Sequence, residues 1–81
     1  MSKLAVVFKF QEKNMTIQCM NTDTLNQIFN RYCTKANLER NDVKFYSDAK
    51  EIRGDDNSLD SHKIKNYHTF NVVMAKYVIG A

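Results

Sequence analysis

The sequence has no proline, two glycines and two cysteines among its 81 residues. The scarcity of glycine and proline excludes a collagen-like chain. Cys19 and Cys33 are far apart in the sequence, so we expect no disulfide framework and a reducing compartment, the cytoplasm or the nucleus. The longest uncharged apolar run, Leu4 to Phe8, is far too short to span a membrane, and we expect no secretory signal.

The amino-acid balance is that of an ordinary folded domain. Hydrophobic residues make up 43% of the sequence and charged residues 26%, which argues against disorder. A chain of this length builds one domain with a small core, which excludes a multidomain enzyme. The net charge of +3 comes without basic runs, so nucleic-acid binding is not expected as the main role.

Apolar and polar residues alternate near both ends of the sequence, which predicts strands. The alternation over 4–10 and again over 15–20 predicts two strands, joined by a polar turn at 11–14 into an antiparallel hairpin. Shorter alternating stretches predict further strands: one at 43–45, a partner near Ile52 after a turn at 48–50, and a last one at 70–74 that ends near Lys76.

Between the second and third strands, the apolar period becomes that of a helix. Thr24 and Gln27 form a capping-box pattern, and Asn37 tolerates the left-handed conformation that ends helices. These residues predict a helix over 25–36. Leu38 is expected to fold back onto the core.

The segment before the last strand combines a polar loop at 54–57 with a short helical turn at about 59–64, capped by Ser58 or Asp60. The resulting order of elements requires one helix to cover one face of a small mixed sheet of four to five strands, an α+β layout. The crossover through the helix predicts that the first and last strands pair in the centre, which is the β-grasp arrangement.

This pattern resembles the ubiquitin-like proteins over nearly the whole chain. The segment LNQIFNRYCTKANL followed by NDVKFY is similar to the small ubiquitin-like modifiers, and LDSHKIKNYHTF resembles the ubiquitin segment before its last strand. The resemblance implies a β-grasp domain at 1–76 and a flexible tail at 77–81. It lays the buried apolar pattern of ubiquitin on Met15, Ile17, Cys19, Leu25, Ile28, Tyr32, Leu38, Phe45, Ile52, Leu59, Ile64, Phe70 and Val72.

The resemblance also gives the second glycine a role. Conjugated ubiquitin-like modifiers end in glycine, which lets the carboxylate pass through a narrow enzyme channel. Here Gly80 stands alone before Ala81, without the paired glycine of the family. One interpretation is a protein modifier. Ala81 would be removed, and separate activating and conjugating enzymes would join Gly80 to target proteins. Such a modifier can also be one unit of a ubiquitin-like polyprotein. The alternatives are a non-covalent interaction domain of a larger protein and a β-grasp sulfur carrier.

One expected partner-binding surface corresponds to the apolar patch on the sheet of ubiquitin. The matching residues are Tyr46, Asn71 and Val73, with Phe10 near the hairpin. Phe10 also alternates with Phe8 as a core residue would, so both interpretations of Phe10 stay open.

A second expected surface is the groove with which small ubiquitin-like modifiers take up an extended peptide as an added strand. The matching residues are Ile17, Cys19, Ile28 and Lys35. The periodicity of the first three favours burial in the core instead. Lys50 matches the lysine of the main ubiquitin chain linkage, with an exposed turn lysine as the alternative.

Catalytic chemistry is not expected. Neither cysteine has a His and acid pattern nearby, and two histidines, His62 and His68, do not build a zinc site. We therefore expect no enzyme, no metal, no cofactor and no small-molecule substrate. The expected partners are proteins, namely activating and conjugating enzymes or domains that bind ubiquitin-like folds, and the domain itself is expected to be a monomer.

Overall fold

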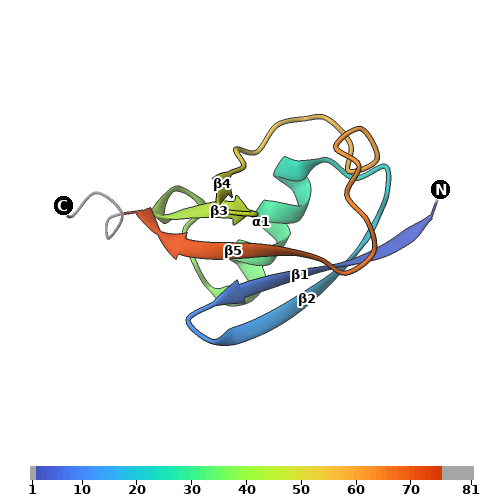
Figure 1. Ribbon diagram of the computed structural model, residues 1–81. Helices are drawn as coiled ribbons and strands as arrows, with labels where there is room; N and C mark the ends of the chain where they lie inside the picture. Colours follow the sequence, from blue (N-terminus) through green and yellow to red (C-terminus); the bar gives the residue numbers. More distant parts are fainter. Residues whose placement is uncertain (1, 76–81) are drawn as a thin grey trace.

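The computed structural model describes residues 2–75 as a sheet with one helix packed across it (Figure 1). Over these residues, no helix is both long enough and apolar enough to cross a membrane. The elements follow in the order β1 (Lys3–Phe10), β2 (Lys13–Met20), α1 (Leu25–Ala36), the 3-10 helix η1 (Arg40–Asp42), β3 (Val43–Ser47), β4 (Lys50–Glu51) and β5 (His68–Met74).

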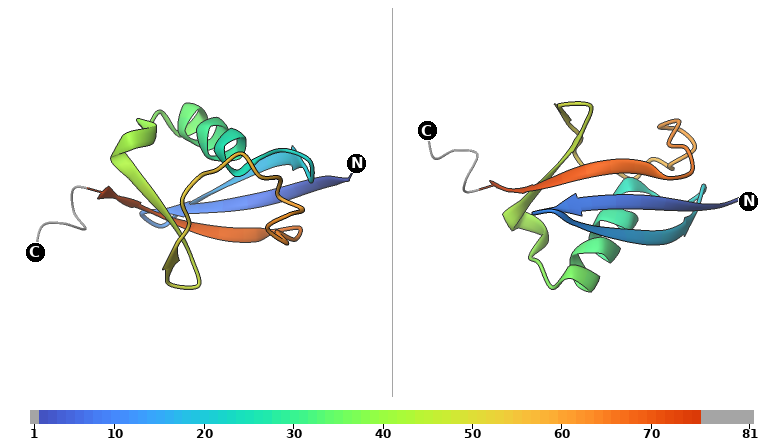
Figure 2. Two further views of the ribbon diagram at one scale, coloured as in Figure 1. Left: turned by 90° about the horizontal axis from the view of Figure 1, so that it is seen from above. Right: turned by 60° about the horizontal axis from the view of Figure 1, so that its bottom comes forward.

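The strands form one mixed sheet in the order β2-β1-β5-β3-β4. β1 and β5 run parallel in its centre, and the other three strand pairs are antiparallel. Figure 2 shows α1 lying across one face of this sheet. The predicted pairing of the first and last strands is therefore confirmed, and with it the α+β fold of the β-grasp type.

The first hairpin is tighter than the sequence indicates. Phe10 pairs with Lys13, which leaves only Gln11 and Glu12 in the turn. Both have positive φ angles, 50° and 67°, as a two-residue turn needs in order to match the twist of its strands. The predicted turn at 11–14 is wrong because polar residues can extend an edge strand, where their side chains stay in solvent.

The second hairpin repeats this geometry. Asp48 and Ala49 have φ angles of 53° and 66°, and Ser47 pairs with Lys50. The turn predicted at 48–50 is therefore one residue too long. The partner strand is short, but its pairing continues past β4, since the amide of Ile52 donates to the carbonyl of Phe45 at 2.8 Å.

The helix has the predicted bounds and both predicted caps. The amide of Gln27 donates to Thr24 Oγ1 at 3.1 Å, and the amide of Thr24 donates to Gln27 Oε1 at 2.8 Å, a complete capping box. At the other end, Asn37 is left-handed, with a φ of 58°. The next amide, of Leu38, donates back to the carbonyl of Cys33 at 2.9 Å, and Leu38 packs against the core as expected.

Two short connections contain helical turns, one after α1 and one before β5. The 3-10 helix η1 was not predicted, because three polar residues carry no apolar period. The segment predicted as a helical turn forms consecutive hydrogen-bonded turns, with the amide of Ile64 donating to the carbonyl of Leu59 at 3.0 Å. Ser58 caps these turns, since its Oγ accepts from the amide of Ser61 at 3.0 Å.

The core between the sheet and α1 is built on aromatic rings. Phe8 stacks on Tyr32 with ring centroids 4.4 Å apart, and Phe29 stacks on Phe45 at 4.0 Å. Phe70 contacts this group from β5, with its ring 5.6 Å from that of Phe8. Each fully buried large apolar side chain contributes about 1.5–3 kcal/mol, so these rings are a major source of stability. No polar or charged residue is buried within residues 2–75.

Candidate protein-interaction surfaces

The face of the sheet that points away from α1 holds three of the four predicted patch residues. Tyr46 of β3 pairs with Asn71 of β5, and Val73 pairs with Lys44 on the same two strands. Strand alternation places these side chains outward, because their neighbours Phe45 and Val72 point into the core. Asn71 is exposed, while Tyr46 and Val73 are half-buried. We call Tyr46, Asn71 and Val73 the outer patch.

Phe10 does not belong to the outer patch. It lies on the α1 side of the sheet, packs against the core, and lines a hollow together with Tyr32 and Lys35. Its assignment to the patch is wrong because Phe10 and Phe8 are two residues apart on one strand and therefore share a face. Of the two interpretations left open by the sequence, the one with Phe10 facing the core holds.

The predicted peptide groove is filled by its own residues. Ile17 and Ile28 are fully buried, and Cys19 is 6% exposed, so their side chains form the core between β2 and α1. Lys35 is exposed on α1 and does not join them. A groove lined by these four residues is therefore wrong, and the reason is that the apolar period of β2 and α1 already commits the first three to burial.

Two hollows nevertheless lie between β2 and α1. One, of about 290 Å³, lies beside the first hairpin, and we call it the hairpin hollow. The other, of about 410 Å³, lies at the far end of β2 and has Cys19 in its wall. The hairpin hollow is lined by Phe10, Gln11, Lys13, Met15, Tyr32, Lys35 and Ala36.

Side chains occupy one end of the β2 edge. β2 is the outermost strand of the sheet, which leaves its outer backbone groups without a neighbouring strand. The amide of Met20 donates to Asp23 Oδ2 at 2.9 Å, and Arg31 Nη1 donates to the carbonyl of Gln18 at 3.1 Å. Asp23 and Arg31 also contact each other at 3.4 Å. This pair therefore occupies the edge near the helix start.

The two-residue turn determines which backbone groups of β2 face outward. The residues that flank such a turn, Phe10 and Lys13, exchange hydrogen bonds, and every second pair after them does the same. The amides and carbonyls of Asn14, Thr16, Gln18 and Met20 therefore point away from β1. With Gln18 and Met20 partly occupied, Asn14 and Thr16 form the open part of the edge, next to the hairpin hollow. No sequence pattern predicts this division, because it depends on the register of the hairpin.

The remaining predicted site residues stay separate from these surfaces. Lys50 is exposed in β4, as a chain-linkage lysine or a plain surface lysine would be. Gly80, together with the predicted tail at 77–81, lies outside the described residues.

The cysteines are poor nucleophiles. Both thiols are buried, and burial raises the pKa of Cys19 and of Cys33, so both stay protonated near neutral pH. The charge of Asp23 adds to the rise for Cys19, whose Sγ lies 3.6 Å from the carbonyl oxygen of Leu4. The burial of Cys19 agrees with its place in the apolar alternation of β2.

The histidines lie apart in separate contacts. His62 Nε2 lies 2.9 Å from Asp55 Oδ2, and His68 Nε2 lies 3.0 Å from Ser47 Oγ. Throughout residues 2–75, no three side chains of the His, Cys, Asp and Glu types gather as metal ligands would. The hydrogen bond from His62 lowers the pKa of Asp55, so this carboxylate stays ionised.

The comparison with known families agrees with the β-grasp fold. A family model described as ubiquitin-2 like Rad60 SUMO-like matches residues 3–74. The chain belongs to this family of ubiquitin-like domains. A search of curated proteins found no match.

Solved structures show the same fold. A solution NMR structure of the ubiquitin-like domain of an Arabidopsis thaliana protein superposes with a TM-score of 0.79 at 20% identity, covering 91% of this chain and 79% of that one. A second structure of the same Arabidopsis protein, from sparse NMR data and evolutionary couplings, gives a TM-score of 0.80 at 20% identity, with coverages of 91% and 88%. The family match confirms the resemblance to ubiquitin-like proteins predicted from the sequence, and the solved structures confirm the fold. Ubiquitin-like domains generally interact with proteins. The open part of the β2 edge and the outer patch are therefore the candidate surfaces for protein binding.

Proposed function

We propose that this domain binds other proteins non-covalently, by adding an extended peptide to the open part of the β2 edge. The observation that carries the proposal is the division of this edge. Asp23 and Arg31 occupy one end, whereas Asn14 and Thr16 face outward beside the hairpin hollow. An added strand gains backbone hydrogen bonds along such an edge and specificity from pockets for every second side chain.

The hairpin hollow defines the preferred peptide. Phe10, Met15 and Tyr32 offer apolar contacts, and Lys13 and Lys35 add two positive charges at the rim. A peptide of aliphatic, β-branched residues followed by acidic residues matches both features, since the former favour extended backbone and the latter complement the lysines.

The experiment is an NMR titration of the ¹⁵N-labelled domain with the peptide Val-Ile-Val-Ile-Asp-Asp-Glu-Glu, acetylated and amidated. We expect the largest shifts at the amides of residues 13–17. Thr16→Pro removes an outward amide without touching the β1 ladder, and should weaken binding about fivefold, the equivalent of one hydrogen bond of about 1 kcal/mol.

The matched control is Thr16→Ala, which keeps the amide and should leave the affinity within about twofold. Equal affinity of the Pro and Ala variants would contradict strand addition at this edge. Shifts confined to Tyr46, Asn71 and Val73 would instead assign the binding to the outer patch, where an exposed aromatic residue can anchor a partner.

A second candidate function is that of a protein modifier. β5 ends at Met74, and Gly80 stands six positions further along the sequence, counting from 74 to 80. A glycine beyond the last strand supports conjugation through its carboxylate, because glycine offers no side chain to obstruct an enzyme channel. The test exposes Gly80 as the terminus and measures ATP-dependent thioester adducts in a cell lysate, with Gly80→Ala as the control. Absence of any adduct that depends on Gly80 would contradict the modifier role.

A further inference from the structure

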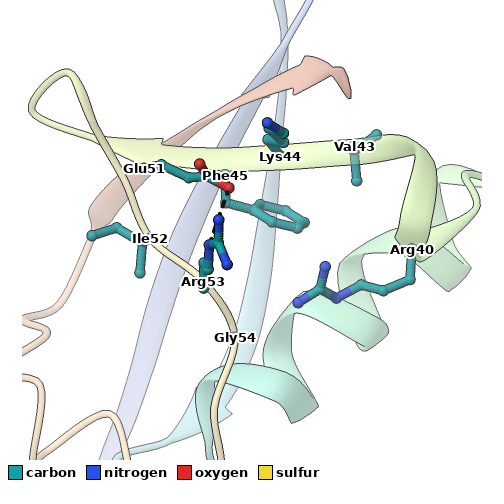
Figure 3. A pocket seen from close by; sticks show the side chains of 8 residues that line it. All are labelled: Arg40, Val43, Lys44, Phe45, Glu51, Ile52, Arg53 and Gly54. Atoms are coloured by element: carbon teal, nitrogen blue, oxygen red, sulfur yellow. Dashed lines mark ion pairs between the residues drawn. The ribbon is translucent and has the colours of Figure 1, made fainter. Parts of the chain in front are cut away.

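A basic hollow lies at the opposite edge of the sheet from β2. Its volume is about 250 Å³, and it is bounded by η1, β3 and the segment that follows β4. Figure 3 shows Arg40 entering from the η1 side and Arg53 from the opposite side, with Phe45 between them. We call it the Arg40 hollow. It is lined by Arg40, Val43, Lys44, Phe45, Glu51, Ile52, Arg53 and Gly54.

The guanidinium of Arg40 is held in place by the core. Its Cζ lies 5.2 Å from the ring centroids of both Phe29 and Phe45, at the side of this stacked pair. Gly54 packs against it so closely that a Cβ at this position would lie 2.5 Å from Arg40 Nη2. A guanidinium fixed in this way loses little conformational freedom when it binds a ligand.

The charge around the hollow is unbalanced. Arg40 and Arg53 line the hollow together with a single carboxylate, that of Glu51, which lies 3.9 Å from Arg53 Nε, while the Lys44 side chain points to the other face of β3 (Figure 3). Among residues 2–75, no carboxylate lies within ion-pair distance of Arg40. The planar donor group of Arg40 is therefore available, with an apolar wall behind it.

We propose that the Arg40 hollow binds a carboxylate side chain of an acidic segment in a partner protein. Arg40 supplies the fork of donors that matches the two oxygens of a carboxylate. Arg53 attracts the neighbouring acidic residues of the segment, and the half-buried Ile52 contacts an aliphatic residue between them. The site shares no residue with the β2 edge or the hairpin hollow, so it stands or falls independently of the proposed function.

The test is a ¹H–¹⁵N NMR titration of the whole chain with the peptide Gly-Asp-Glu-Leu-Glu-Gly, acetylated and amidated. We expect saturable shifts at the amides of residues 43–45 and 52–54. Arg40→Gln should weaken binding about tenfold and Arg53→Gln about threefold, because charged hydrogen bonds are the stronger ones and Arg53 is more exposed. Arg40→Lys keeps a positive charge beside the rings but loses the fork of donors, and should weaken binding about threefold.

The matched control is Lys65→Gln, which removes the same charge from an exposed residue outside the hollow. It should leave the affinity within about 1.5-fold. Three outcomes would overturn the proposal: no saturable shifts at 43–45 and 52–54, an equal loss in the Lys65 variant, or tighter binding of single-stranded oligothymidylate at the same amides. If the spectrum of Arg40→Gln shows unfolding, Arg40→Lys and Arg53→Gln decide the outcome.

Discussion

The rings of Phe29 and Phe45 lie face to face, with planes 10° apart, and join α1 to β3. Arg40 covers the edge of this pair, so one contact serves both the core and the Arg40 hollow. The position of a candidate binding group therefore depends on the packing of two buried aromatic residues.

Removal of one ring should be costly. Phe45 is 2% exposed, and Phe45→Ala should lower the free energy of unfolding by about 3–5 kcal/mol, since it removes ring contacts and leaves a cavity. Urea denaturation measures this change. Tyr67 is 65% exposed, and Tyr67→Ala should change stability by less than about 0.5 kcal/mol. A near-neutral Phe45→Ala would contradict the strand register described for β3.

The occupied end of the β2 edge should be visible in amide exchange. The amide of Met20 donates to Asp23 Oδ2, so Asp23→Ala should speed its hydrogen exchange by at least about threefold. The outward amide of Thr16 should exchange at the same rate in both proteins. NMR-detected exchange measures both sites, with Thr22→Ala as the control for a nearby exposed substitution. An unchanged Met20 rate would contradict the role of Asp23 at this edge.

Stability towards acid should depend on His62. The hydrogen bond from His62, more than those from Asn57, holds the pKa of Asp55 below its ordinary value of 3.8. A carboxyl group whose pKa is lower in the folded state favours folding above its unfolded pKa, and this contribution is lost as the pH falls through the folded pKa.

We therefore expect His62→Ala to raise the pKa of Asp55 towards its ordinary value. The variant should also lose less stability than the unchanged protein between about pH 5 and about pH 2. Carbon-detected NMR titration of the carboxyl group measures the pKa, and urea denaturation at each pH measures the stability. Lys63→Ala should leave both unchanged. Parallel stability curves for the His62 variant and the unchanged protein would contradict the expectation.

Gly54 offers a way to move Arg40 without replacing it. An added methyl group would meet the ends of two side chains, Asn26 and Arg40, and both would have to move. Gly54→Ala should therefore lower the free energy of unfolding by about 0.5–3 kcal/mol, because these side chains must leave their present contacts to make room. It should also weaken the binding of the acidic peptide at the Arg40 hollow, because Arg40 is displaced. Loss of stability without loss of affinity would contradict the close packing of Arg40 on Gly54.

The sequence predicts the fold well because the strongest patterns act locally. The capping box at Thr24 and the left-handed Asn37 determine both ends of α1, and the alternation in β1 and β5 determines which face is buried. The turns were predicted less well. Lys13 and Lys50 are polar and look like turn residues, yet they pair with their partner strands, since edge positions leave a polar side chain in solvent.

The binding surfaces could be predicted only in part. Tyr46, Asn71 and Val73 were predicted from the resemblance to the ubiquitin patch, and the strand alternation places them outward. Ile17 and Ile28 failed as groove residues because the strand alternation of β2 buries the first and the helical period of α1 buries the second. The occupied β2 edge and the Arg40 hollow join residues distant in the sequence, such as Gln18 with Arg31 and Arg40 with Gly54. Such pairs carry no local pattern.

The central position of β5 affects folding during synthesis on the ribosome. β5 separates β1 from β3, so the β1–β2 hairpin and the β3–β4 hairpin cannot join into one sheet before the last strand has been made. Until then, the first hairpin and α1 lack Phe70, and the aromatic rings they present remain open to solvent and to other chains. Folding is therefore expected to follow synthesis of residue 74 rather than accompany it, and a chain cut before β5 should aggregate.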